Sequence, residues 1–238
     1  LGCGSIRSFV EGLTEKPLTV VLSHGHLDHA MGAPEFDKVY MNHADIPVFR
    51  DMADVRGRMG YIQGNVAPEV FAQITEEDFV PAADMSFEEL EDGMVFDLGG
   101  VHVEAIAFPG HTPGTMVFHI PEERLLILGD ACNTFTFLFS GPVPIEEYRE
   151  NLAGIIQRME GKLDRVYLCH HLMEAEPSIM DEVLEVCDDI MAGNTDDIPF
   201  DFMGQKAYIA KTVQPGQPPR ADGKWGNVVY SREYIWKK

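Results

Sequence analysis

The chain has 238 residues, an apolar content of 45% and a net charge of −21 at neutral pH, which suits a single α/β domain over residues 1–238 with a full core. An acidic surface repels phosphate backbones and therefore disfavours nucleic acid as a partner. The chain contains no apolar run of membrane-spanning length and no signal-peptide pattern, and its four cysteines form no CxxC pair, so we expect a cytoplasmic protein with no membrane partner.

The N-terminal region predicts a turn, the start of a helix at residues 6–10, and a buried β-branched strand at 17–22. The strand runs into His24, Gly25, His26, Leu27, Asp28 and His29. In an extended segment the first two imidazoles point to the same side, and the next turn can bring the carboxylate and third imidazole back. Imidazole and carboxylate are ligands for Zn, Fe, Mn or Ni. The stretch therefore predicts a metal site rather than a histidine-rich surface loop.

The region after this motif has a short strand at 38–41 and then a weakly patterned stretch at 44–92. Apolar residues at helical spacing predict one helix over 44–59, and glycines and Pro68 interrupt the remainder. Two interpretations of 44–92 are open: a lid over the metal site, or an ordinary surface insertion.

Regular strands return beyond residue 92, and polar residues follow several of them. A hairpin with a Gly-Gly turn is predicted at 94–98 and 101–107, followed by strands at 115–120, 125–128 and 165–168. His111 lies in the string PGHTPGT after the hairpin, Asp130 closes LLILGD, and His170-His171 follow VYLC. Amphipathic helices are predicted at 145–160 and 177–192. Strands alternating with helices, with polar residues at strand ends, favour an α/β architecture with a site along one edge.

The C-terminal segment 206–238 is unlike the rest of the chain in charge. It has seven basic and two acidic residues, so it carries +5 and the remainder −26. Two strands are predicted here, near 207–213 and 227–235. We expect this basic tail to dock either on the acidic body or on a second copy of the chain in a homodimer.

The motif HxHxDH at residues 24–29 resembles that of the metallo-β-lactamase superfamily. The family's further ligands match His111 in a GH-T turn, Asp130 at a strand end, and His170 after a later strand. The resemblance implies a four-layer αβ/βα sandwich with metals between the edges of two sheets. Cys169 stands where relatives more often have glycine, and the N-terminal strand hairpin of relatives is absent from this sequence.

The resemblance also implies two divalent metal ions, with zinc favoured by family usage and iron, manganese or nickel also compatible with the ligands. Metal one would be held by His24, His26 and His111, and metal two by Asp28, His29 and His170, with Asp130 bridging. His171 is the rival to His170 because the register is ambiguous by one residue. Asp28 would act both as a ligand and as a proton shuttle. His43, His102 and His119 are predicted to be structural or surface residues.

The implied reaction is hydrolysis of a small-molecule ester, thioester or lactone by a metal-bound hydroxide. Asp130 rather than cysteine argues against antibiotic lactamases, and the charge argues against nucleases. Three alternatives are open: a mononuclear iron persulfide dioxygenase, a phosphodiesterase, and a non-catalytic metal-binding scaffold. Substrate-binding residues are not assigned. Phe135, Phe137 and Phe139 either line an apolar substrate pocket or pack in the core, and core packing is favoured.

Overall fold

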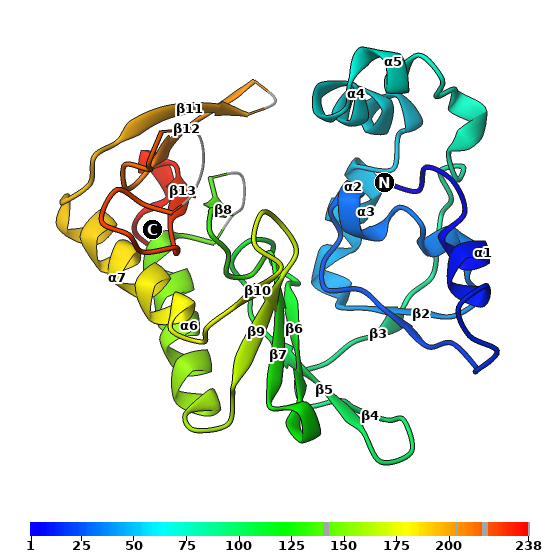
Figure 1. The fold of residues 1–238 in the computed structure, drawn as a ribbon, viewed down its shortest axis with the longest axis horizontal. Helices are drawn as coiled ribbons and strands as arrows, with labels where there is room; N and C mark the ends of the chain where they lie inside the picture. Colours follow the sequence, from blue (N-terminus) through cyan, green and yellow to red (C-terminus); the bar gives the residue numbers. More distant parts are fainter. Residues whose placement is uncertain (140–142, 203, 216–218, 238) are drawn as a thin grey trace. The chain divides into compact units, whose positions relative to one another are not determined.

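The computed structural model describes residues 1–139, 143–202, 204–215 and 219–237. Its chain divides into two compact units, Leu1–Leu90 (unit 1) and Glu91–Lys238 (unit 2), which Figure 1 traces in blue to cyan and in green to red. Each unit has its own sheet and its own apolar core. The mixed α/β class is therefore as expected, while the single domain over 1–238 stays a prediction.

Unit 1 is built on a parallel three-stranded sheet of order β1 (Val20–Val21), β2 (Val39–Met41) and β3 (Glu88–Glu89). The first described strand is β1, and residues 1–19 form no hairpin before it. The predicted helix at 6–10 is confirmed as α1, whereas the predicted strand at 17–22 is shortened to two residues. The unit's helices are α1 (Ile6–Glu11), α2 (Leu27–Ala30), η1 (Ala33–Glu35), η2 (His43–Asp45), α3 (Ile46–Asp51), α4 (Val55–Asn65), α5 (Pro68–Phe71) and η3 (Glu76–Asp78).

The prediction of one helix over 44–59 is wrong, because the chain forms two helices there. α3 ends at Asp51, and α4 begins after Asp54, whose Oδ2 accepts a hydrogen bond from the backbone N–H of Gly57 at 2.9 Å. An aspartate cap of this kind starts a new helix and satisfies a donor that a continuous helix would not expose. The lid role of 44–92 stays a prediction, although Glu88 and Glu89 within it form β3.

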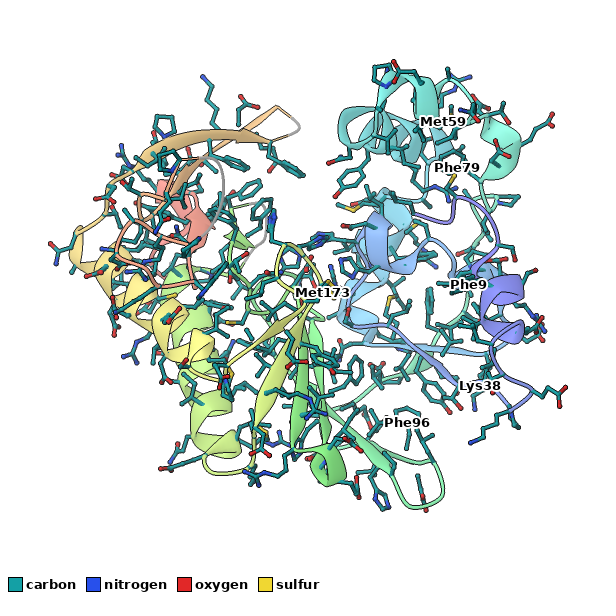
Figure 2. The ribbon with its side chains drawn as sticks, in the orientation of Figure 1. Phe9, Lys38, Met59, Phe79, Phe96 and Met173 are labelled. Atoms are coloured by element: carbon teal, nitrogen blue, oxygen red, sulfur yellow. The ribbon has the colours of Figure 1, made fainter. Side chains whose placement is uncertain are left out.

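A buried arginine ties together distant parts of unit 1. Arg58 on α4 is 1% exposed and donates to the carbonyl of Leu1 at 3.2 Å and of Val80 at 2.8 Å. Its guanidinium lies 5.6 Å from the ring centroid of Phe79, which Figure 2 labels. Because a buried cation needs several partners, these contacts fix α4 to both flanking segments.

Unit 2 contains a six-stranded mixed sheet that carries the predicted polar strand ends. Its order is β10 (Glu174–Ala175), β9 (Arg165–Leu168), β7 (Leu125–Gly129), β6 (Met116–Ile120), β5 (His102–Ala107) and β4 (Val95–Asp97). Gly99 and Gly100 have φ of 85° and 108°, so the Gly-Gly hairpin is confirmed. β7 and β9 run parallel, and their carboxyl ends therefore lie at the same edge of the sheet.

A second sheet in unit 2 has the order β11 (Ile198–Phe202), β12 (Gln205–Ile209), β13 (Val228–Tyr230) and β8 (Thr136–Leu138). The two predicted tail strands correspond to β12 and β13, while β8 and β11 were not predicted as strands. Both predicted amphipathic helices form, as α6 (Ile145–Met159) and α7 (Ile179–Ala192); η4 (Pro121–Glu123) and η5 (Arg232–Tyr234) are short turns of helix. In the described ranges, none of the helices has both the length and the apolar character needed to cross a bilayer.

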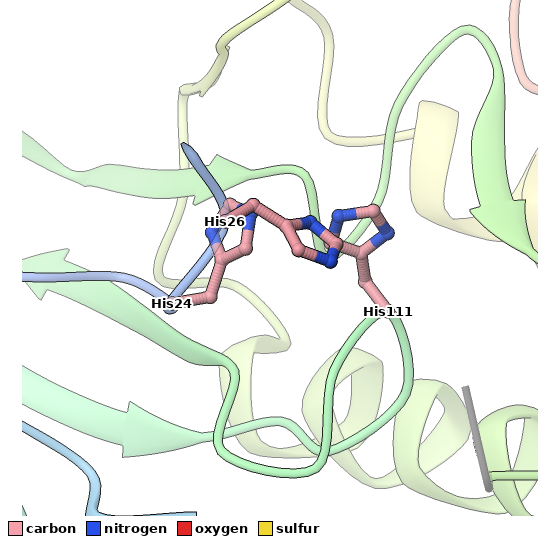
Figure 3. A group of neighbouring side chains, drawn as sticks. All are labelled: His24, His26 and His111. Carbon is pink, nitrogen blue, oxygen red and sulfur yellow. The ribbon is translucent and has the colours of Figure 1, made fainter. Parts of the chain in front are cut away.

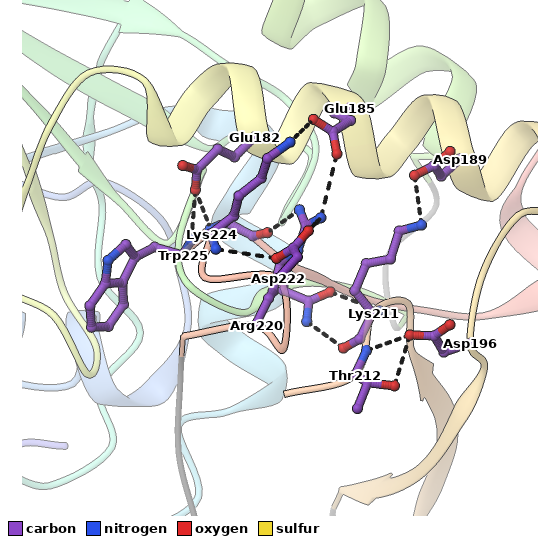
Figure 4. A network of polar contacts seen from close by, with 12 residues as sticks. Glu182, Glu185, Asp189, Asp196, Lys211, Thr212, Arg220, Asp222, Lys224 and Trp225 are labelled. Atoms are coloured by element: carbon purple, nitrogen blue, oxygen red, sulfur yellow. Dashed lines mark hydrogen bonds and ion pairs between the residues drawn. The ribbon is translucent and has the colours of Figure 1, made fainter. Parts of the chain in front are cut away.

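The basic tail forms ion pairs with the acidic helices of unit 2 (Figure 4), which is one of the two outcomes expected from its charge. Lys211 pairs with Asp189 of α7 at 2.6 Å, and Lys237 pairs with Glu150 of α6 at 2.6 Å. Glu185 of α7 receives both Arg220, at 3.4 Å, and Lys224. Lys238 lies outside the described residues. These ion pairs connect the C-terminal segment to helices α6 and α7.

Candidate metal centre

The histidine-rich loop of unit 1 is the turn from β1 into the one-turn helix α2. His26 is the N-cap of α2 with an extended backbone (φ −65°, ψ 153°), and Asp28 and His29 lie within the helix. The ring centroids of His24 and His26 are 4.8 Å apart, and those of His24 and His29 are 4.2 Å apart. The turn therefore gathers the side chains of one short stretch, as predicted from the alternation of an extended chain followed by a turn.

Gly25 is required at its position because the loop passes against α3. Its N–H donates to Oδ2 of the fully buried Asp45 at 2.7 Å. A Cβ at this position would lie 2.8 Å from the Asp45 carbonyl oxygen and 2.9 Å from the Phe49 nitrogen. Since both obstacles are backbone atoms, only glycine fits, and the two flanking histidines are held rigidly.

Asp28 has a neighbour that sequence reasoning missed. The hydroxyl of Tyr61, on α4, donates to Oδ2 of Asp28 at 3.3 Å, and Nε2 of His29 lies 3.6 Å from the same oxygen. The 44–92 stretch therefore contributes a polar group to this loop. No local motif marks Tyr61, because the contact joins positions 33 residues apart.

His111 of unit 2 sits in a tight turn between β5 and β6. The turn is closed by the Gly110 N–H donating to the Thr112 carbonyl at 3.0 Å, and by the Thr112 N–H donating to Oγ1 of Thr115 at 2.9 Å. Nδ1 of His111 lies 2.8 Å from the carbonyl oxygen of Phe137. Because a carbonyl only accepts, Nδ1 carries the proton and Nε2 keeps its lone pair, the form in which imidazole binds a metal.

Asp130 and His170 follow the parallel neighbours β7 and β9, where Gly129 is in register with Leu168. Oδ2 of Asp130 lies 3.2 Å from Nε2 of His170 and 3.6 Å from Nε2 of His111. The Asp130 side chain is 12% exposed. Three predicted ligands from three separate strand ends therefore come together within unit 2, with two imidazoles beside one carboxylate.

His171, the rival of His170, turns elsewhere. Its backbone has a positive φ of 61°, and its ring meets that of Phe135 edge-on at 5.7 Å. Burial is the largest cause of a lowered pKa for this imidazole, followed by the neighbouring His170. The structure thus puts His170 beside Asp130 and His171 against an aromatic ring, while the ligand role of either stays a prediction.

Tyr148 on helix α6 packs against residues next to His111 and Asp130, which the sequence did not indicate. Tyr148 is fully buried, its ring stacks on Phe108 at 5.4 Å, and its hydroxyl donates to the carbonyl of Ala131 at 2.7 Å. A Cβ on Gly110 would lie 2.3 Å from Cδ2 of Tyr148. One tyrosine therefore fixes both the turn before His111 and the residue after Asp130.

The remaining histidines singled out in the sequence have other partners. Nε2 of His43 lies 2.9 Å from the Phe87 carbonyl oxygen, Nδ1 of His102 lies 2.6 Å from Glu122, and Nδ1 of His119 lies 3.3 Å from Glu104. These contacts fit the structural or surface roles predicted for them.

The donor set in each unit fits a divalent cation by its chemistry. Imidazole nitrogens and carboxylate oxygens suit Zn, Fe, Mn or Ni, and His/Asp groups of this kind occur among the described residues. Figure 3 shows the two nearby imidazoles of His24 and His26 on their loop, and the imidazole of His111 on the separate turn after β5. Unit 1 offers His24, His26, Asp28 and His29, and unit 2 offers His111, Asp130 and His170.

Residues 7–171 match the family model of the metallo-beta-lactamase superfamily. That stretch contains all seven predicted ligands and extends across both units.

Curated relatives are similar over about half of this chain. The human acyl-coenzyme A thioesterase MBLAC2 is 26% identical over 124 residues, which cover 52% of this chain and 44% of that protein. The atrochrysone carboxyl ACP thioesterase of Aspergillus fumigatus is 27% identical over 137 residues, which cover 58% of this chain and 33% of that protein. The chain thus spans less than half the length of these two relatives.

Solved structures share the fold at low sequence identity. An archaeal metallo-beta-lactamase superfamily protein from Sulfolobus tokodaii has a TM-score of 0.52 and 22% identity, covering 81% of this chain and 74% of that one. A metallo-beta-lactamase from Pontibacter korlensis has a TM-score of 0.51 and 14% identity, covering 79% and 80%. The fold class expected from the sequence is confirmed.

Proposed function

The chain belongs to the metallo-β-lactamase superfamily, and from that premise we propose that it is a metal-dependent hydrolase of small-molecule thioesters. The family match covers every predicted ligand, and two relatives are named as thioesterases. Thioesters are therefore favoured over the esters and lactones that the same chemistry would serve.

In this proposal seven side chains would hold two divalent cations. His24, His26 and His111 would hold the first, Asp28, His29 and His170 would hold the second, and Asp130 would bridge them. The single observation that carries the proposal is the convergence on Asp130, whose Oδ2 has Nε2 of His111 at 3.6 Å and Nε2 of His170 at 3.2 Å. Two imidazoles from two different loops beside one carboxylate are the arrangement expected of a carboxylate shared by two cations.

A bound divalent cation would supply the chemistry that the side chains lack, by lowering the pKa of a coordinated water to about 7 and by polarising the substrate carbonyl. The residues of the chain orient these parts. The Phe137 carbonyl holds the proton of His111 on Nδ1, and the Tyr61 hydroxyl holds Oδ2 of Asp28. Because these side chains are already oriented, little free energy is needed to reorient them during the reaction.

The reaction balances as an acyl transfer to water. Hydroxide adds to the thioester carbon, the C–S bond breaks, and the electron pair of that bond leaves with sulfur. In the proposal the Asp28 carboxylate, next to the Tyr61 hydroxyl, would take the proton released when water becomes hydroxide and pass it to sulfur. The products are a thiol and a carboxylic acid, which loses its proton to solvent. Asp28 is thus both a ligand and a proton carrier in the proposal.

The test joins elemental analysis of the purified protein to an assay of thiol release from acetyl-, butanoyl- and decanoyl-coenzyme A. We expect two divalent metal ions per chain, and loss of hydrolysis after chelation with recovery on adding Zn²⁺. Asp28→Ala should abolish hydrolysis. His102→Ala, which removes an imidazole paired with Glu122 on the surface, should leave it unchanged.

Three outcomes would overturn the proposal. One iron per chain with oxygen uptake on glutathione persulfide would make the protein a dioxygenase. Hydrolysis of phosphodiesters to phosphate monoesters, without thiol release from the thioesters, would make it a phosphodiesterase. Unchanged hydrolysis in Asp28→Ala would remove the second metal site from the reaction.

A further inference from the structure

The second sheet of unit 2 has two unlike faces. Leu138 of β8 and Val228 and Tyr230 of β13 point to one face and belong to the core formed with α6 and α7. On the opposite face, strand pairing aligns Phe137, Val229, Ile209 and Ile198 across all four strands. Because side chains alternate along a strand, Phe135 and Phe139 share that opposite face with Phe137.

Four phenylalanines on this face form what we call the aromatic wall: Phe135, Phe137, Phe200 and Phe202. The ring of Phe137 lies 5.6 Å from that of Phe200 and 5.3 Å from that of Phe202. The rings cover Ala207 and Val229, which are 2% and 0% exposed.

The aromatic wall is only partly buried, unlike the residues beneath it. Phe139 is 7% exposed, whereas all four rings of the wall keep part of their surface accessible. Rings that served packing alone would be covered, because contiguous exposed apolar surface is unfavourable in water and marks binding sites. The core packing predicted for this run is found at Phe139, which belongs to a buried cluster, while Phe135 and Phe137 pack against that cluster and also keep part of their surface accessible.

The wall is continuous with the predicted metal ligands of unit 2. The backbone carbonyl of Phe137 accepts the hydrogen bond from Nδ1 of His111 at 2.8 Å. At the other end of the run, the ring of Phe135 contacts that of His171, next to His170, at 5.7 Å. An apolar group lying on the wall would thus begin where a reacting carbonyl would be held.

We infer that the aromatic wall binds the acyl group of the substrate, and that the substrate is a medium-chain acyl thioester; the inference rests on the proposed thioester hydrolysis. Phe135 and Phe137 are about 7 Å apart along an extended chain, and the rings of Phe200 and Phe202 lie 5.6 and 5.3 Å from that of Phe137. An apolar surface made of four rings suits a medium-length acyl chain better than an acetyl or butanoyl group, which would contact only part of it. Asp201 of β11 and Lys206 of β12 are opposite each other in the strand register and lie on the other face of the sheet. The charged residues of this hairpin are therefore not on the face of the aromatic wall.

The first experiment measures kcat/KM of the metal-loaded full chain for butanoyl- and decanoyl-coenzyme A. The value of kcat/KM for decanoyl-coenzyme A should be about ten- to a hundredfold higher, because the additional methylene groups are transferred from water to the aromatic wall. Phe200→Ala and Phe202→Ala should each lower kcat/KM for decanoyl by about tenfold and for butanoyl by less than about twofold. Phe202→Leu, which keeps an apolar surface, should retain most of the preference, and Phe96→Ala on β4 of the other sheet is the matched control.

The second experiment measures binding without reaction, using the thioether S-decyl-coenzyme A, which has no carbonyl, against S-ethyl-coenzyme A in a calorimeter. We expect the decyl compound to bind at least about tenfold tighter, and this gain to be lost in Phe200→Ala and Phe202→Ala. Equal binding of the two compounds, or equal losses for both in the wall variants, would overturn the inference. Absence of hydrolysis at every chain length, with tight decyl binding, would instead reject the thioesterase proposal and keep the wall as an apolar binding site.

Discussion

The two sets of predicted ligands are built in different ways. In unit 1, His24, His26, Asp28 and His29 come from one stretch of six residues at the end of β1. In unit 2, His111, Asp130 and His170 come from three loops that only the order of the six-stranded sheet brings together. The first set depends on local backbone shape, and the second on the correct assembly of a whole sheet. A change far from the ligands should therefore affect the second set more readily than the first.

The largest expected effect comes from the residue on which the second set converges. Asp130→Ala removes the carboxylate beside both His111 and His170, and we expect kcat/KM to fall by about a thousandfold or more with loss of bound metal. His26→Ala should lose metal but leave the Asp130 cluster intact. Asp164→Ala, an exposed aspartate paired with Arg124, is the control. Full metal content in Asp130→Ala would contradict the proposed bridge.

The second prediction compares the two crowded glycines. In Gly25→Ala the new Cβ meets backbone atoms at 2.8 and 2.9 Å, and in Gly110→Ala it meets the Tyr148 ring at 2.3 Å. Each should lower the free energy of unfolding by about 2–4 kcal/mol in urea titrations. Adding Tyr148→Leu should recover part of the loss in Gly110→Ala, while no single side-chain change relieves Gly25→Ala.

Gly154, on α6, gives the matched control for these glycine substitutions. Nothing lies within 4 Å of a Cβ built there, so Gly154→Ala should stabilise the protein by about 0.5–1 kcal/mol. If Gly154→Ala and Gly110→Ala behaved alike, packing against Tyr148 would not be the reason for glycine at 110.

A smaller effect is expected at Tyr61, the distant neighbour of the local set. Tyr61→Phe removes only the hydroxyl that donates to Asp28, and kcat/KM should fall about tenfold with no change in Tm, as for other groups that orient a ligand. Tyr234→Phe, in the tail, provides the comparison. An unchanged rate would mean that the Tyr61 hydroxyl does not orient Asp28 for the reaction.

The smallest effect concerns acid stability of the second sheet. Asp197, directly before β11, has a lowered pKa, mainly because the Tyr230 hydroxyl donates to it, with Thr195 and Arg232 adding to this. A carboxyl with a depressed folded pKa stabilises the protein above its unfolded pKa, and this is lost as pH falls through the folded value. Asp197→Asn should therefore lower Tm near pH 7, with the gap closing below about pH 4. If the difference in Tm between Asp197→Asn and the unmodified protein persisted in acid, the effect would come from packing and not from the charge of Asp197.

Sequence reasoning succeeded where the signal is local. The HxHxDH stretch, the Gly-Gly hairpin and the strand ends at Asp130 and His170 are readable from alternation and turn residues. β11 was missed because Pro199 interrupts its pattern, and β11 is an edge strand, the place where proline is tolerated. Tyr61 and Tyr148 were missed because their contacts join distant positions, and only tertiary packing shows that they touch the ligand loops.

Tyr148 has a consequence for how variants of this chain would be interpreted. Its ring supports the turn before His111 and its hydroxyl holds Ala131, next to Asp130, although it takes no part in the chemistry. A substitution in the middle of α6 would therefore look, in a kinetic assay, like the loss of a ligand. The free energy of unfolding has to be measured together with kcat/KM to distinguish a loss of structure from the loss of a catalytic group.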